Sequence, residues 1–207
     1  LASVLVALPL FLPLAVSVVA GESVAGEAST GSLRNLLVVP AGRTRLLAVK
    51  YAGVAAFALA CAVTVVGVGI LAGVVLFPAG DVTLLSGTSV GMPEALYRAL
   101  LATLYIAAML ATVGMIGLFF STLTEVPMGA MAATATLTVI SQILDTIPQV
   151  SVIHEYLYTH WWLAFGDLMR DPIAVDDVRT GLITQAVYLV VFGTLAWARF
   201  TTKDVTS

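Results

Sequence analysis

The sequence predicts an all-α fold, namely a polytopic membrane helical bundle in which residues 1–207 form a single transmembrane domain. Of the residues, 60% are hydrophobic and only 10% are charged, whereas soluble domains carry about 25% charged residues. The apolar residues form uninterrupted blocks, and the longest block, 52–77, contains no charged residue. A transmembrane β-barrel would need strands that alternate polar and apolar residues. These blocks do not alternate, so helices are expected.

Five blocks are long enough to cross a bilayer, which takes about 20 helical residues. They cover residues 1–20, 52–77, 99–120, 126–147 and 180–198. Pro9 and Pro13 are expected to bend the first span, because each proline removes an internal helix hydrogen bond. That span begins within apolar sequence, so we expect that the chain lacks an N-terminal part.

The basic residues between the spans predict the orientation of the chain. One side of the membrane would receive six of them and the other side three, so the positive-inside rule places the 22–50 loop and the C-terminus in the cytoplasm. The six are Arg34, Arg43, Arg45, Lys50, Arg199 and Lys203, and the three are Arg98, Arg170 and Arg179.

The polar segment between the first two spans has a distinctive order of residues. An acidic residue, Glu27, precedes a Gly-Ser-Leu-Arg turn at 31–34, which is followed by a Leu-Leu pair, Pro40 and Arg43. This order resembles the cytosolic segment of permease subunits in the ABC-2 family of ATP-binding-cassette transporters, E…GTLR…LL…P-x-x-R. Ser32 stands where that family more often has Thr, and residues 41–42 depart from its common Val-Ser. Residues 158–168 and 195–205 also resemble the loop before the last helix and the closing tail of these permeases.

The resemblance implies the membrane-spanning permease subunit of an ATP-driven exporter with a type V exporter-like fold. Such permeases have six spans with both ends in the cytoplasm, so 1–20 would be the second helix. The implied partners are ABC ATPase (nucleotide-binding) subunits and a second permease subunit, as a homo- or heterodimer, in a bacterial plasma membrane. The sequence contains no G-x-x-x-x-G-K-[ST] motif. We therefore expect no enzyme activity and no cofactor on this chain, with ATP and Mg on the partner ATPase, and no nucleic acid.

Residues 22–45 are expected to form the cytosolic coupling segment, a short amphipathic helix pair broken near Thr30 and Gly31. A cleft in the ATPase would hold its apolar side, while Glu22, Glu27 and Arg34 would be exposed and set the register. The alternative is a solvated loop whose arginines bind anionic lipid head groups. The candidate coupling residues are Glu22, Glu27, Gly31, Leu33, Arg34, Leu37, Pro40 and Arg43.

A polar stripe within span 126–147 gives the candidate pathway lining. Its residues step by three and four, so they share one helix face, which is costly to turn toward lipid. Hydroxyls that bond back to their own helix are the structural alternative to a pathway. The candidates are Thr134, Thr138, Ser141 and Gln142, with Asp145 near the outer interface.

Residues 151–178 are expected to form an outer interfacial segment that carries an aromatic belt. Within it, the candidate outer gate consists of Tyr158, Trp161, Trp162 and Phe165.

No catalytic or metal site is predicted. The G-x-S-x-G match at 87–91 lacks the sheet that a serine nucleophile requires, and His154 and His160 lie six residues apart, on different sides of a helix.

The pair Gly69 and Gly73 has a spacing typical of close helix packing. A non-transporting scaffold or assembly protein remains an alternative. A secondary carrier is disfavoured, because no Asp, Glu, Lys or His lies at the centre of a predicted span.

Overall fold

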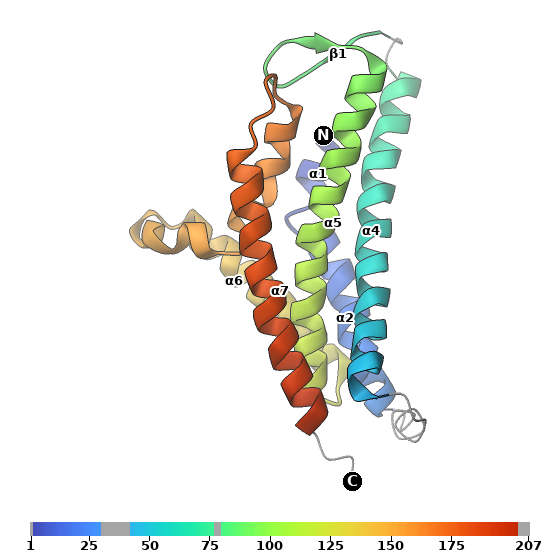
Figure 1. Ribbon diagram of the computed structural model, residues 1–207, viewed down its shortest axis with the longest axis vertical. Coiled ribbons are helices and arrows are strands. Elements are labelled where there is room, and N and C mark those ends of the chain that lie inside the picture. The colour runs from blue at the N-terminus through green and yellow to red at the C-terminus, as the bar shows by residue number, and fades with distance from the viewer. Residues whose placement is uncertain (1, 30–41, 77–79, 203–207) are drawn as a thin grey trace.

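The computed structural model describes residues 2–29, 42–76 and 80–202. The elements are α1 (Ala2–Ala7), α2 (Phe11–Ser29), α4 (Arg43–Leu76), β1 (Val82–Thr83), β2 (Ser89–Val90), α5 (Met92–Leu123), α6 (Pro127–Thr146), the 3-10 helices η1 (Pro148–Tyr156) and η2 (His160–Met169), and α7 (Asp176–Thr202). Five of them, α2, α4, α5, α6 and α7, are long and apolar enough to cross a membrane (Figure 1). The prediction of a mostly helical membrane bundle with five spans is therefore confirmed, and β1 and β2 are the strands of the described part.

Four of these five helices, α2, α4, α5 and α7, extend beyond the apolar blocks that predicted them, whereas α6 lies within its block. α2 continues nine residues past the predicted end of its span at 20, and α4 starts at Arg43 instead of residue 52. Hydropathy detects the apolar part of a helix, whereas backbone hydrogen bonds also hold polar turns in helical form. As predicted, the first span is broken near Pro9, which lies between α1 and α2. Pro13 falls in the first turn of α2, where the missing N–H has no helical partner to lose.

α5 is the central helix of the bundle and packs against α2, α4, α6 and α7 (Figure 1). The buried side chains of α5 include Ile106, Met109, Leu110, Val113, Ile116 and Leu118. α4, in contrast, is 6% buried over its most apolar window. A helix that is apolar all round and exposed on most sides suits a lipid environment. In Figure 1 the hairpin of β1 and β2 marks the upper end of the bundle, and the end of α7 marks the lower end.

Small residues bring the helices close together in the lower half of the bundle. A Cβ atom added at Gly117 of α5 would lie 2.6 Å from Cβ of Ala20 on α2, and one added at Gly114 would lie 2.5 Å from Cγ1 of Val54 on α4. At Gly21 it would lie 2.7 Å from Cγ of Met131 on α6. Because lipid offers no hydrophobic drive for helix association, such close van der Waals packing is the main attraction between helices.

The upper end is held by a hairpin and a buried arginine. Residue Gly87 has a positive φ of 83°, and its turn connects β1 to the antiparallel β2. Arg98 of α5 is 5% exposed; its Nε donates to Oε1 of Glu94 at 2.7 Å, and Nη1 donates to the carbonyl of Arg170. The carboxylate of Asp171 lies 3.8 Å away. Arg98 thus ties α5 to the chain that leaves η2.

The predicted interfacial segment 151–178 divides into two parts with different surroundings. η1 has no buried residue and projects sideways from the bundle at about middle height (Figure 1). η2 packs against α5 and α7. Only the first part therefore fits the expectation of a surface segment.

Candidate functional site

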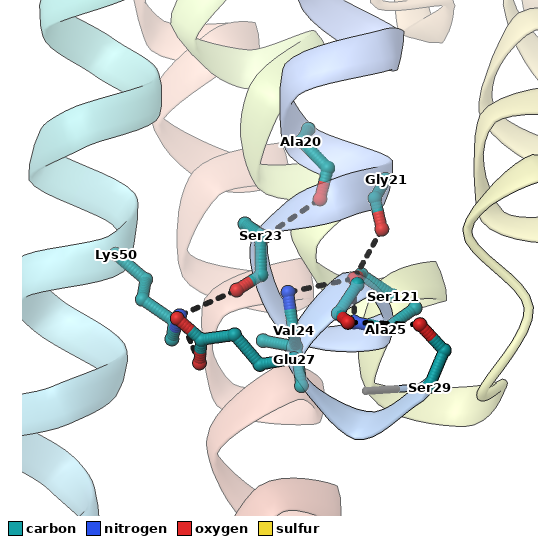
Figure 2. Close-up of polar contacts among 10 residues, drawn as sticks. Ala20, Gly21, Ser23, Val24, Ala25, Glu27, Ser29, Lys50 and Ser121 are labelled. Atoms are coloured by element: carbon teal, nitrogen blue, oxygen red, sulfur yellow. Dashed lines mark hydrogen bonds and ion pairs between the residues drawn. The ribbon is translucent and has the colours of Figure 1, made fainter. Parts of the chain in front are cut away.

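Ser121 connects α5 to the backbone of α2 at the lower end of the bundle. The side chain of Ser121 is fully buried, and its Oγ donates a hydrogen bond to the carbonyl oxygen of Gly21 at 2.7 Å. The same Oγ accepts from the backbone N–H groups of Ala25 at 2.9 Å and Val24 at 3.1 Å (Figure 2). One hydroxyl therefore uses its donor and both acceptor positions on a single turn of α2.

Lys50 connects α4 to the same part of α2. Its Nζ lies 2.6 Å from Oε2 of Glu27 and donates to the carbonyl oxygen of Ser23 at 2.5 Å (Figure 2). The side chain of Lys50 is 11% exposed and that of Glu27 is 33% exposed. A largely buried ammonium group is costly unless it is paired and hydrogen-bonded. Both conditions are met here, so α2 and α4 are joined by a charged contact.

α4 is also tied to the end of α7. Nη1 of Arg43 donates to the carbonyl oxygen of Thr201 at 2.8 Å, and Nε1 of Trp197 donates to Oγ1 of Thr44 at 3.0 Å. The first turn of α4 is therefore fixed to the last turns of α7. Together with the contacts of Lys50 and Ser121, these bonds join α2, α4, α5 and α7 at the lower end of the bundle.

The predicted coupling residues fall partly within this site. Glu22 is exposed on α2, as expected. The expectation that Glu27 is exposed is met only in part, because the side chain is half-buried and its carboxylate pairs with Lys50. Arg43 starts α4 and contacts α7. Gly31, Leu33, Arg34, Leu37 and Pro40 lie outside the described residues.

Sequence reasoning did not assign Lys50 and Ser121 to this site. The sequence indicates only a role in orientation for Lys50, because it lies 23 residues after Glu27 and so offers no local sign of the pairing. Ser121 is a small polar residue at the end of an apolar run. Such a residue is as compatible with a hydroxyl bonded to its own helix as with one bonded to a neighbouring helix.

The polar stripe of α6 faces protein. Thr134 is fully buried and donates to the carbonyl oxygen of Ala130 at 2.8 Å, and Thr138 donates to that of Thr134 at 2.9 Å. Thr138 also accepts from the Tyr158 hydroxyl at 3.0 Å. Ser141 is hydrogen-bonded to Thr159 at 2.7 Å, and Gln142 donates to the carbonyl oxygen of Pro9 at 2.6 Å. Thr134 thus bonds back to its own helix, as the structural alternative expects, whereas the other three residues join α6 to other parts of the chain. A role as pathway lining remains a prediction.

The candidate gate residues form the core of the upper half. Tyr158 and Phe165 are each 2% exposed and Trp162 is 3% exposed, so the expectation that they form a belt at the interface is wrong for these three. Trp161 is half-buried, and its carbonyl oxygen accepts a hydrogen bond from the Tyr105 hydroxyl of α5 at 2.7 Å. Gln185 of α7 donates to the carbonyl oxygen of Tyr158 at 2.6 Å. These residues thus pack in the core against α5 and α7, and a role as a gate remains a prediction.

Asp145 and His160 make an ionisable pair beside this core. Nδ1 of His160 lies 2.5 Å from Oδ1 of Asp145, and the ring centroid of His154 lies 6.0 Å from that of His160. Within residues 2–29, 42–76 and 80–202, no group of three or more His, Cys, Asp or Glu side chains could hold a metal ion.

Comparison with known proteins identifies a family but no activity. A family model described as "Protein of unknown function (DUF2705)" matches residues 1–206 of the chain. No curated protein and no solved structure matches the chain.

Proposed function

We propose that this chain, which belongs to the DUF2705 family, is the membrane-spanning permease subunit of an ATP-driven ABC exporter. It would form the substrate pathway together with a second permease subunit. The 22–45 segment would couple that pathway to separate ATPase subunits, which would bind ATP and Mg. The proposal starts from the sequence resemblance to ABC-2 permeases.

One structural observation supports the proposal most directly: both described borders of the 22–45 segment are anchored to the membrane helices. On one side, Ser121 and Lys50 hold the last turns of α2. On the other side, Arg43 holds the first turn of α4 against α7. A segment with free borders would absorb a push from an ATPase, whereas one with anchored borders passes the displacement to the helices.

The distribution of basic residues supports a cytoplasmic location for the lower end. Arg43 and Lys50 lie near the start of α4, and Arg199 lies near the end of α7. Excess Lys and Arg near helix ends favours the cytoplasmic side of a membrane. The proposed location is a bacterial plasma membrane with the C-terminus in the cytoplasm.

The Asp145 and His160 pair favours one alternative function, a secondary carrier. His160 directly precedes Trp161, whose carbonyl oxygen accepts a hydrogen bond from Tyr105 of α5. Tyr105 lies 13 residues after the start of α5 at Met92, which is about 20 Å along the helix. His160 therefore adjoins a residue that contacts the middle part of α5, although sequence reasoning found no ionisable group at the centre of a span. Ionisable groups at such depth often serve proton or ion pathways.

Purification of the tagged chain from its native membrane in mild detergent tests the exporter proposal. We expect an ATP-hydrolysing subunit to co-purify, and Arg34→Glu to reduce that association. Arg199→Glu is the matched control, since Arg199 is an exposed charge at the same end but outside the segment. A wild-type chain that purifies without a nucleotide-binding partner would favour the scaffold.

Reconstitution of the chain alone separates the carrier from both other functions. Under an imposed pH gradient, proteoliposomes should show no more proton flux than empty liposomes, as followed with an entrapped pH-sensitive dye. A flux that Asp145→Asn abolishes would overturn the exporter in favour of the carrier.

A further inference from the structure

A cavity of about 430 Å³ lies at the upper end of the bundle, apart from the lower-end site. Among the described residues, five segments line it: Val4 belongs to α1, Gly73 to α4, Leu84 to the hairpin, Ala102 to α5 and Phe165 to η2. Small-molecule sites typically occupy about 300–1,000 Å³. The cavity is therefore large enough to hold part of a ligand.

Two glycines on α4 make room for the cavity. Gly69 and Gly73 are four residues apart, so they lie on one face of the helix, and both line the cavity. A Cβ atom added at Gly73 would meet no atom within 4 Å. In the single chain, the two glycines thus widen a cavity instead of allowing the close helix contact that their spacing predicted.

The lining excludes water as a stable occupant. A buried water molecule needs two to four polar partners. Among the described lining residues, the single polar side chain is that of Asp81, and all the others are apolar or glycine. An empty space of this size would forfeit the dispersion contacts of every atom that lines it. An apolar chain fits the lining best, because it restores these contacts without requiring hydrogen bonds.

Asp81 determines which charge the head group of such a ligand should carry. Asp81 is exposed and precedes β1, so its carboxylate lies where the cavity meets the surface. None of the ion pairs among the described residues involves Asp81; the nearby Glu94 and Asp171 both pair with Arg98. An unpaired carboxylate at the opening attracts a cationic group and repels an anionic one.

We propose that this cavity binds the single alkyl chain of a membrane amphiphile whose cationic head group lies against Asp81. The amphiphile would enter from the leaflet at the upper end of the bundle. The alkyl chain would fill the space beside Gly69 and Gly73. This assignment does not depend on the proposed transport function.

Native mass spectrometry of the full chain, released from a neutral detergent, tests the proposal. The probes are tetradecylamine, tetradecanol and tetradecanoate, which share one alkyl chain and differ in head-group charge. We expect one bound molecule of the amine, with affinity roughly two- to five-fold higher than for the alcohol, as suits an exposed ion pair. Binding of tetradecanoate should be the weakest. Asp81→Asn should remove the preference for the amine while one alkyl chain still binds.

Substitutions in the wall locate the alkyl chain. Gly73→Leu should weaken binding of the amine roughly tenfold or more, because the new side chain takes the space of about two methylene groups. Gly67→Leu is the matched control: Gly67 is exposed on the same helix and does not line the cavity. Ala95→Phe narrows the cavity from α5 and replaces Gly73→Leu if that variant does not fold.

Two results would overturn the proposal. One is equal affinity of the wild-type chain for the amine and for tetradecanoate. The other is undiminished binding of the amine when either Gly73→Leu or Ala95→Phe is folded, since the alkyl chain would then lie elsewhere.

Discussion

Ser121 of α5 makes three hydrogen bonds to one turn of α2, and the shortest, at 2.7 Å, ends on the carbonyl oxygen of Gly21. Gly21 also brings α2 against α6, because any side chain there would overlap Met131. The turn of α2 that precedes the proposed coupling segment is therefore fixed on two sides. Movement of that segment would displace α5, the central helix, together with α2.

Ser121→Ala should destabilise the chain by about 1–3 kcal/mol, because it leaves a buried carbonyl and two buried N–H groups with fewer partners. Thermal or denaturant unfolding in detergent, followed by circular dichroism, measures the loss. Ser17→Ala is the matched control, since the buried Ser17 hydroxyl bonds only to Pro13 of its own helix among the contacts described. An equal loss in both variants would argue against a special role for Ser121.

The contact between Lys50 and Glu27 predicts that the stability of the chain depends on both charges being present. Glu27→Gln should cost about 1–3 kcal/mol, because the largely buried ammonium group of Lys50 loses its counter-charge. The double variant with Lys50→Met should regain part of that loss, since the unpaired charge is then gone. Unfolding of the wild type, both single variants and the double variant gives the coupling energy directly.

Glu22→Gln provides the control for the Glu27 variant. Glu22 is exposed on the same helix, so its substitution should change stability by less than about 0.5 kcal/mol. Strict additivity of Glu27→Gln and Lys50→Met would show that the ion pair does not join α2 to α4.

Close helix contacts predict opposite effects of the same substitution at two glycines. Gly117→Ala should destabilise by about 1–3 kcal/mol, because its Cβ atom would lie 2.6 Å from that of Ala20. Gly53→Ala on α4 should stabilise by up to about 1 kcal/mol, since its Cβ atom would meet nothing within 4 Å and alanine favours helix. Unfolding midpoints of the two variants, measured side by side, check the difference. The same sign of change in both would contradict the packing described here.

Hydropathy predicted the helices of this fold, but it could not predict their partners. The apolar blocks located the five long helices of the described residues, because length and apolarity are what a bilayer requires. Trp162 and Phe165 illustrate the limit: an aromatic side chain in an amphipathic segment suits a lipid interface and a protein core equally well. Depth in the core is decided by long-range contacts such as the one between Tyr105 and Trp161, 56 residues apart. For the same reason, the sequence carries no local sign that Lys50 pairs with Glu27, 23 residues before it.

The packing of η2 against α7 makes a substitution at Gly181 of α7 informative, because Gly181 lies against the aromatic core. A Cβ atom at Gly181 would overlap the Tyr105 hydroxyl and lie 2.8 Å from Cβ of Trp161. Gly181→Ala should therefore break the hydrogen bond between Tyr105 and Trp161 and push η2 away from α7. Quenching of tryptophan fluorescence by acrylamide should increase, because Trp161 and the buried Trp162 become accessible. Gly193→Ala on the same helix is the control, since its Cβ atom would meet Met115 at an ordinary 3.5 Å. Unchanged quenching in folded Gly181→Ala would show that η2 is not held by this contact, and it would weaken the prediction that Trp161 and Trp162 belong to an outer gate.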